Sequence, residues 1–191
     1  MPALHTPIHE IPFVSVDVET TGLDPRLDQI IEIGAVKVID GQTIGEWDTL
    51  VSIDQRIPMS AHRVHGITDA MLAGKPTVQD AVRSLLVFAG DGTLVEHSHR
   101  AFDIAFLEIA HGGPLPTPCL NTCTLSRKLF PFHRSHSLAE CCRRYSIDNQ
   151  NAHRALNDAR ATAQLLQHLL QACSARYPHF GDLLAVASVQ R

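Results

Sequence analysis

Two acidic residues, Asp17 and Glu19, stand in a run whose apolar residues alternate with a period of two. This alternation predicts a strand over Ile11 to Glu19. Because side chains two positions apart share one face of a strand, both carboxylates project from the same side. Burial strongly disfavours an unpaired carboxylate. The pair therefore predicts either an exposed edge strand or a site where cations neutralise the charge.

Two further acids, Asp103 and Asp158, lie near the beginnings of predicted helices. Asp103 falls in the first turn of a helix over Phe102 to His111, where a lone aspartate usually complements the helix dipole. Asp158 falls on the longest helical pattern, from about Arg154 to Cys173, and shares a stripe with apolar residues that face the packed side. The residues of the first helix expected to face the core are Phe102, Phe106 and Ile109.

A histidine, His153, precedes Asp158 by five positions. Five positions correspond to about 140° of rotation at ~3.6 residues per turn, so His153 does not stand directly above Asp158 on a helix. We expect it in the preceding loop or the first turn. Histidine exchanges protons near neutral pH and is a common general base. The alternative for His153 is a solvated histidine at the start of a helix.

Four segments carry a resemblance to a known family. They read VSVDVETTGLDP continuing into DQIIEIGAVKV, HGITDAML from His65, HSHRAFDIAFL around Asp103, and AHRALNDARATAQLL around Asp158. This wording resembles the DEDD exonuclease superfamily, and the His-x-x-x-x-Asp spacing is that of its DEDDh (DnaQ-like) subclass. It is most similar to the proofreading epsilon subunit of bacterial DNA polymerase III and to free-standing DNA exonuclease relatives, over roughly residues 11–172.

The resemblance implies a metal-dependent 3′-to-5′ exonuclease that releases nucleoside 5′-monophosphates from DNA, single-stranded in particular. Two Mg²⁺ ions, replaceable by Mn²⁺, would be held by Asp17, Glu19, Asp103 and Asp158, and His153 would activate water. The residues expected to contact the substrate are Thr20, Thr21, Gly22, Leu23, His65, His99 and Phe102. Two alternatives stay open: an RNA-trimming exoribonuclease of the same fold, and a catalytically silent, polymerase-associated binding module.

The chain departs from the commonest family wording at two places. Ser98 and His99 stand where His-Asn is common, and Asn121 replaces a common Asp. The first difference concerns substrate contacts beside Asp103 and leaves the carboxylate itself in place. Together the two differences argue against the main proofreading subunit. A further acid, Glu32, is expected to form hydrogen bonds beside the site. No zinc is expected, because the residues considered for it have no zinc-site spacing; they are His133, His136, Cys141 and Cys142.

The remaining pattern predicts how these residues are positioned. A turn over 20–28 is followed by a strand over 29–39, a hairpin at Asp40-Gly41 and a third strand ending near Ser52. A loop over 53–69 leads to a helix over 78–89 and a strand over 92–97. Later helices are expected over 137–145 and, in the tail, within 183–189. The order predicts an α/β, ribonuclease H-like mixed sheet of about five strands, three antiparallel and then parallel, flanked by helices.

Length and composition limit the remaining possibilities. The 191 residues predict one domain over 11–173, with an N-terminal extension, 1–10, and a C-terminal tail, 174–191. A net charge of −4 disfavours a protein that coats long nucleic acid, so contact with DNA 3′ ends, favoured over RNA ends, should be local. The odd number of cysteines and the absence of a leader or apolar span predict reduced thiols and a cytoplasmic protein without a membrane. A DNA polymerase subunit is a further expected partner.

Overall fold

A five-stranded mixed sheet runs through residues 2–149 and 151–189, which are described by a computed structural model. Its strand order is β3-β2-β1-β4-β5, with β2 antiparallel to β1 and β3, and β4 parallel to β1 and β5. The strands are β1 (Phe13–Thr20), β2 (Ile30–Ile39), β3 (Gln42–Leu50), β4 (Thr93–Glu96) and β5 (Cys119–Asn121). The predicted class and strand arrangement are confirmed.

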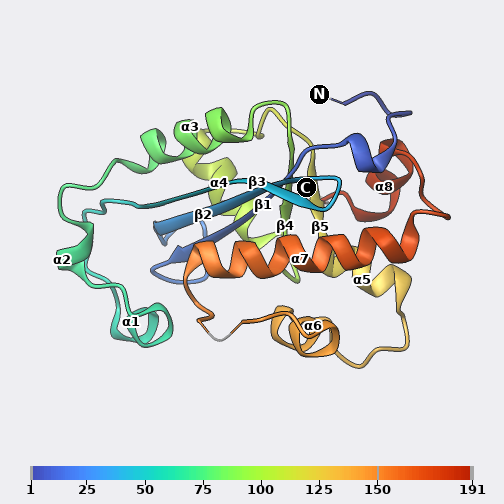
Figure 1. The fold of residues 1–191 in the computed structure, drawn as a ribbon. Coiled ribbons are helices and arrows are strands. Elements are labelled where there is room, and N and C mark those ends of the chain that lie inside the picture. The colour runs from blue at the N-terminus through green and yellow to red at the C-terminus, as the bar shows by residue number, and fades with distance from the viewer. Residues whose placement is uncertain (1, 150, 190–191) are drawn as a thin grey trace.

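Helices cover both faces of this sheet (Figure 1). The longest, α7, crosses one face, and α3 and α4 lie on the other. The helices are η1 (Ile8–Glu10), α1 (Met59–His65), α2 (Asp69–Leu72), α3 (Val78–Ala89), α4 (Phe102–His111), α5 (Thr122–Leu129), α6 (Leu138–Tyr145), α7 (Ala155–Cys173) and α8 (Phe180–Ala187). No helix in the described ranges is both long and apolar enough to span a membrane.

The period of two in β1 divides its side chains between the two layers. Its valines pack with α3 and α4, whereas Phe13 packs with α7. Ser15 lies on the α7 side, because its hydroxyl donates to the Ala159 carbonyl at 2.8 Å. Asp17 and Glu19 continue that side of the strand. The fold therefore directs both carboxylates towards α7.

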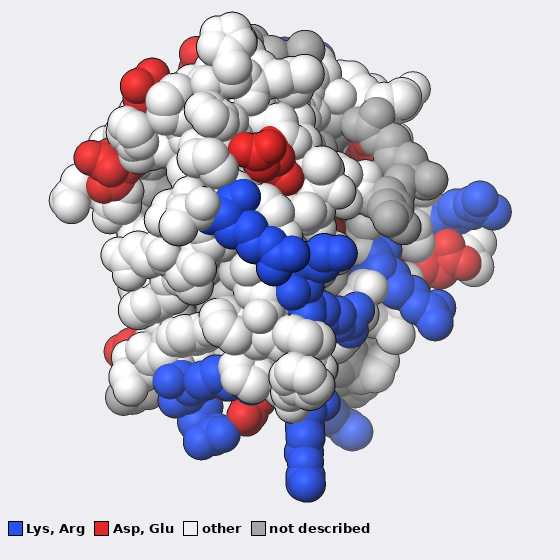
Figure 2. Space-filling view, turned by 90° about the vertical axis from the view of Figure 1, so that its right-hand side faces the viewer, with Lys and Arg blue, Asp and Glu red and all other residues white. Residues whose placement is uncertain are grey.

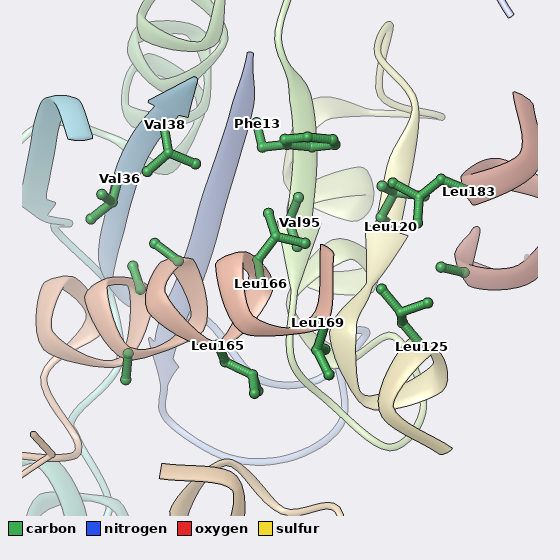
Figure 3. Packing of buried hydrophobic residues seen from close by; sticks show 14 of the residues in the cluster. Phe13, Val36, Val38, Val95, Leu120, Leu125, Leu165, Leu166, Leu169 and Leu183 are labelled. Atoms are coloured by element: carbon green, nitrogen blue, oxygen red, sulfur yellow. The ribbon is translucent and has the colours of Figure 1, made fainter. Parts of the chain in front are cut away.

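The body of α7 is rich in Ala, Leu and Gln and contains neither Gly nor Pro, which suits a long helix. Figure 3 shows Leu166 between this helix and the strands, near Val95, while Leu165 points away from the sheet. Both leucines are buried, so α7 has further packed elements, including α6, on its outer side. This double burial fixes the helix whose first turn carries Asp158.

The two edges of the sheet differ. The backbone of Val189 donates to the Cys119 carbonyl at 2.9 Å, and Ser188 forms a bridge with Leu120, so the C-terminal residues cover the outer side of β5. Strand β3 forms the opposite edge of the sheet. Its connection to β2 is the predicted two-residue hairpin, with Asp40 and Gly41 at φ values of 46° and 74°.

The tail packs onto the main body together with the N-terminal segment. Pro7 forms a bridge with His179, and Phe180 is fully buried in the same core cluster as Ile8 and Phe13. The expected tail helix is present, but its bounds differ from the apolar run at 183–189. It begins three residues before that run and ends at Ala187, two residues before the run ends. The helix begins at Phe180 because that side chain is buried in a core formed by residues elsewhere in the chain. The tail sequence alone contains no information about that core.

Two expectations about local structure are wrong. The segment 53–69 is not all loop, because α1 occupies Met59–His65 between Pro58 and a left-handed Gly66. Ile109 does not face the core and is 51% exposed. The buried stripe of α4 includes Leu107, and a position two residues later is rotated by about 200° from it. Strand β5 and helix α5 were not anticipated from the sequence.

Candidate active site

The carboxylates of β1 lie in the part of the strand that is still paired with β2 but no longer paired with β4. In the antiparallel pair with β2, Asp17 is opposite Gly34 and Glu19 is opposite Glu32. On the other side, β4 pairs with β1 only as far as Ser15. The end of β1 therefore has free backbone groups facing the segment that follows β4.

Asp103 occupies that position. Its carboxylate accepts a hydrogen bond from the Val18 N–H, between the two acids of β1, at 3.1 Å. Asp103 is buried in the first turn of α4. The Asp103 side chain thus accepts from a backbone N–H of β1 that a longer β4 would have paired. This hydrogen bond brings the third carboxylate beside the first two.

The fourth acid is positioned by a close approach of α7 to β2. A Cβ atom at Gly34 would lie 2.2 Å from the Leu156 nitrogen and 2.3 Å from the Ala155 carbonyl carbon. Only glycine permits this contact between helix and strand backbones. Since Gly34 is opposite Asp17, the first turn of α7 places Asp158 beside that acid.

Glu32 fixes the start of the same helix. Its buried carboxylate accepts from Arg154, with the shortest contact at 2.6 Å from Nη2, and from the Ala155 N–H at 3.0 Å. The hydrogen-bonding role expected for Glu32 is confirmed. The N–H at the helix start and the arginine both donate to this carboxylate, so Glu32 acts as an anchor for α7.

His153 lies in the loop before α7, as its spacing from Asp158 predicted. It is exposed and has a left-handed backbone, with φ at 66°. Its N–H donates to the Asp158 Oδ2 at 2.7 Å. Ligand-type atoms of Glu19, His153 and Asp158 lie within 4.8 Å of one another. Three of the five predicted catalytic residues thus form one compact group.

The electrostatics of the site favour a bound cation. Burial, followed by repulsion from Asp103, Asp158 and Glu19, raises the pKa of Asp17 well above its ordinary value. Burial is also the largest cause that raises the pKa of Glu19 to about 8, with Asp158 next. The pKa values of Asp103 and Asp158 are raised in the same direction, mainly by burial.

These raised pKa values indicate that the site suits a metal. Burial and neighbouring acids disfavour the charged form of each carboxylate, and divalent cations would reduce that penalty. Carboxylate oxygens are the ligands preferred by hard cations such as Mg²⁺ and Mn²⁺. The residues present therefore fit a divalent metal centre.

The turn after β1 is tied together by its threonines. The Thr20 hydroxyl donates to the Gly22 carbonyl at 2.6 Å, and the Thr21 hydroxyl accepts from the Gln29 N–H at 2.9 Å. Both threonines are buried, whereas the Leu23 side chain is 83% exposed. The turn thus holds an apolar side chain outward, directly after the strand that carries Asp17 and Glu19.

His65 is buried at the end of α1 and lies towards the site. Its Nδ1 accepts from the Ile67 N–H at 3.0 Å, while its Nε2 has no hydrogen-bond partner within the described ranges. Burial lowers the pKa of His65, and the groups that influence it include Glu32 and His153. The ring therefore has one unused polar atom near the catalytic group.

The other two predicted contact residues, His99 and Phe102, both precede Asp103 in the chain. His99 is exposed and contacts Cys123 and Arg127 of α5. Phe102 is half-buried, and its ring lies 4.8 Å from that of Phe106. Phe102 therefore contributes to the core while remaining next to the carboxylate.

One buried acid beside the site, Glu96, was missed. Its carboxylate accepts from Asn121 at 2.7 Å, from the Ser98 hydroxyl at 3.1 Å and from the Ile104 N–H at 3.2 Å. Burial raises its pKa. The signal that could have found it is the joint occurrence of an acid at the end of an apolar strand and an amide at Asn121. Asn121 can donate to Glu96, which an aspartate could not do.

The sequence matches known proteins over nearly all of its length. The family model RNase_T, described as an exonuclease, matches residues 14–166. DNA polymerase III subunit epsilon of Aquifex aeolicus is 32% identical over 183 residues, which cover 94% of this chain and 90% of that protein. The PolC-type DNA polymerase III of Bacillus subtilis is 34% identical over 187 residues, but these are only 13% of its length.

Solved structures share the fold. Exonuclease X in complex with 5′ overhanging duplex DNA superposes with a TM-score of 0.75 and 29% identity, over 90% of this chain and 98% of that chain. E. coli Exonuclease I in complex with a dT13 oligonucleotide gives a TM-score of 0.73 at 16% identity, over 87% of this chain and 42% of that chain. The second likeness concerns the fold alone.

Proposed function

The chain belongs to the DnaQ-like exonuclease family, and from this premise we propose that it is a metal-dependent 3′-to-5′ exonuclease acting on DNA. The observation that carries the proposal is the convergence of four acids and one histidine at the end of β1. Asp103 bonds to the backbone between Asp17 and Glu19, and Asp158 lies with Glu19 and His153 in one group.

In this proposal the four carboxylates hold two Mg²⁺ ions, with Mn²⁺ as a substitute. When bound, such ions polarise the phosphodiester, lower the pKa of a coordinated water and neutralise the leaving oxygen. Asp17 has more acidic neighbours that raise its pKa than the other three acids have. It would hold the cations together with Glu19, Asp103 and Asp158.

His153 accepts the proton of the attacking water. It is exposed, and its backbone N–H donates to Asp158, so the residue is held beside that acid. Attack on the last phosphodiester releases a nucleoside 5′-monophosphate and leaves a new 3′ hydroxyl. The proton of the water moves to the imidazole and then to solvent, and the departing 3′ oxygen takes up a proton from solvent to become the hydroxyl.

Contacts with the terminal nucleotide are assigned to the elements around this group. Leu23, held outward by the turn of Thr20, Thr21 and Gly22, packs against the terminal base. His65 offers its free Nε2 to the substrate backbone. The remaining proposed contact residues, on the α4 side, are His99 and Phe102.

DNA is the proposed substrate because the epsilon relative is a DNA polymerase subunit by name and the structure of Exonuclease X contains duplex DNA. The same relatives make a DNA polymerase the proposed protein partner. The decisive experiment compares matched single-stranded DNA, duplex DNA and RNA with either the 3′ or the 5′ end blocked, with Mg²⁺ and with EDTA. We expect DNA to be shortened from a free 3′ end only when metal is present.

Three outcomes would contradict the proposal in different ways. Preferential degradation of RNA would assign the chain to RNA trimming. Activity that persists with a blocked 3′ end would overturn the polarity. Binding of DNA without hydrolysis under any metal condition would identify a silent binding module.

A further inference from the structure

The last turn of α5 and the loop that follows it carry several basic residues in an otherwise acidic chain. Within residues 127–136, called here the basic segment, Arg127, Lys128 and Arg134 are exposed. The sequence contains no Asp or Glu between Thr122 and Ala139, although the whole chain has a net charge of −4. Figure 2 shows the side of the molecule where α5 lies, with Lys and Arg side chains gathered near its middle and along its lower part.

Two cations of this segment lack the acidic partners that some arginines elsewhere in the described chain have. Arg143 is paired with Glu140, and Arg83 is paired with Asp80. Lys128 and Arg134, in contrast, have no ion-pair or hydrogen-bond partner within the described ranges. Their charges are therefore available to an external anion, and a phosphate backbone is the common polyanion that exposed Lys and Arg bind.

An aromatic ring lies between these cations in the chain. Phe132 is 96% exposed, the highest exposure among the large apolar residues of the described chain. Its neighbour Phe130 instead stacks on His133, with ring centroids 5.1 Å apart, and so helps to hold the loop. Exposed aromatic rings beside cations provide stacking platforms for unpaired bases.

The basic segment is attached to the chain that leads into the active site. The His97 ring contacts the Thr122 hydroxyl and the His136 carbonyl, each at 2.8 Å. Arg127 contacts His99, four residues before Asp103. Four residues span at most about 14 Å, so the basic segment begins a few nucleotides from the carboxylates.

We propose that the basic segment binds the single-stranded part of the substrate a few nucleotides away from the scissile end. Arg127, Lys128 and Arg134 contact phosphates, and a base stacks on Phe132. This inference rests on the proposed nuclease function, because the strand must end among the four carboxylates. It also explains how an acidic protein engages a polyanion: contact is confined to one local patch.

The test uses the Lys128→Gln/Arg134→Gln double variant and Phe132→Ala. Matched controls are Arg83→Gln, which removes a charge on α3, and Val87→Ala, which trims an apolar side chain that is 78% exposed. Each protein is assayed on single-stranded DNA of about 20 nucleotides, longer than the ~4 to 16 that one binding fold covers, and on a dinucleotide. Thermal unfolding confirms that each variant is folded.

We expect the patch variants to raise KM for the long strand on the order of 10-fold and to leave dinucleotide hydrolysis unchanged. The double variant should also reduce the salt dependence of binding by about 1.4 in log–log slope, since each lost phosphate contact contributes ~0.7 for a single strand. Binding is measured by fluorescence anisotropy of the labelled strand with EDTA, so this readout does not require activity.

The possible failures are distinguishable. If the long strand binds and is cleaved equally well by patch and control variants, the patch proposal is overturned while the nuclease proposal stands. A basic segment that captured only an acidic protein would give this same result. If the parent protein hydrolyses neither substrate, the proposed function fails, and the anisotropy data still decide whether the patch binds nucleic acid.

Discussion

Three carboxylates at or beside this site each accept a hydrogen bond from a backbone N–H. Val18 supplies an N–H to Asp103, His153 supplies one to Asp158, and Ala155 supplies one to Glu32. Asp17 has the largest number of acidic neighbours that raise its pKa. Its charge is therefore useful for binding a cation but unfavourable for the metal-free fold.

Replacing Asp17 with Asn separates these two effects. Hydrolysis should fall on the order of 100-fold or more, because a proposed metal ligand is lost. The metal-free protein should be at least as stable as the parent at alkaline pH, because mutual repulsion is reduced. Steady-state kinetics and thermal unfolding with EDTA measure both effects. Full activity in this variant would remove Asp17 from the metal site.

The pairing of Glu96 with Asn121 gives a second prediction at this scale. Asn121→Asp places two carboxylates where a 2.7 Å hydrogen bond existed, so the free energy of unfolding at neutral pH should fall by about 1–3 kcal/mol. Adding Glu96→Gln restores a donor–acceptor pair and should recover most of the loss. Urea unfolding of the single and double variants measures the coupling. Additive effects would show that the two side chains do not depend on each other.

At the scale of elements, the position of α7 decides whether the site exists. Two contacts fix the first turn of this helix. Glu32 accepts hydrogen bonds at its start, and the helix backbone packs directly against Gly34 of β2. A shift of this helix would move Asp158 and His153 together, away from the acids of β1. The geometry of the site thus depends on a residue without a side chain.

Gly34→Ala tests this dependence. The added methyl group would lie within 2.5 Å of three backbone atoms of α7, none of which can rotate away. Both stability and hydrolysis should fall, with a loss of about 1–3 kcal/mol in unfolding free energy from overpacking. Gly45→Ala is a matched control, since its Cβ would meet only the Phe88 ring, at 3.2 Å. Equal effects at both glycines would refute the role of the close approach.

Elements with a local signal were predictable from the sequence. Alternation in β1 placed Asp17 and Glu19 on one face, Asp40-Gly41 gave the hairpin, and the long helical pattern gave α7 nearly to the residue. Helix α1 was not predictable, because it is short and has no side-chain cap at Pro58.

Contacts between distant parts of the chain were the least predictable. The bond between Glu96 and Asn121 joins residues 25 positions apart, and the pair of Glu32 and Arg154 joins residues 122 apart. Periodicity and capping report on neighbours within one or two turns, so they contain no information about such pairs. The family wording predicted a set of acids as metal ligands, which remains a prediction, but it contained nothing about the donors that hold them.

At the scale of the whole molecule, the acidic site sets the pH dependence of stability. The folded state of the metal-free protein keeps a proton on Glu19 up to about pH 8, whereas the unfolded chain releases it near pH 4.5. Stability contributed by this group therefore falls as pH rises through that range. His97 has the opposite effect on stability. Burial lowers its pKa from the ordinary 6.5 to about 4, so the stability that it contributes falls as pH drops below 6.5.

The two effects separate above pH 6.5, where His97 is neutral in both states. Between there and about pH 8 the metal-free protein should lose stability as pH rises, as measured by urea unfolding in EDTA. Saturating Mg²⁺ should flatten or reverse this trend, because the cations replace the protons. A metal-free protein that gained stability across this window would contradict the assigned electrostatics.

The unequal edges of the sheet have a consequence for self-association. Residues 188 and 189 shield β5 from any incoming chain, so unwanted strand addition can occur only along β3. Glu46 on that strand is paired with Arg160 of α7, at 2.6 Å between Nη2 and Oε2, whereas Asp48 is exposed. A second copy added along this edge would have to bring its own charged side chains beside this ion pair and beside Asp48, so the charged edge disfavours strand addition.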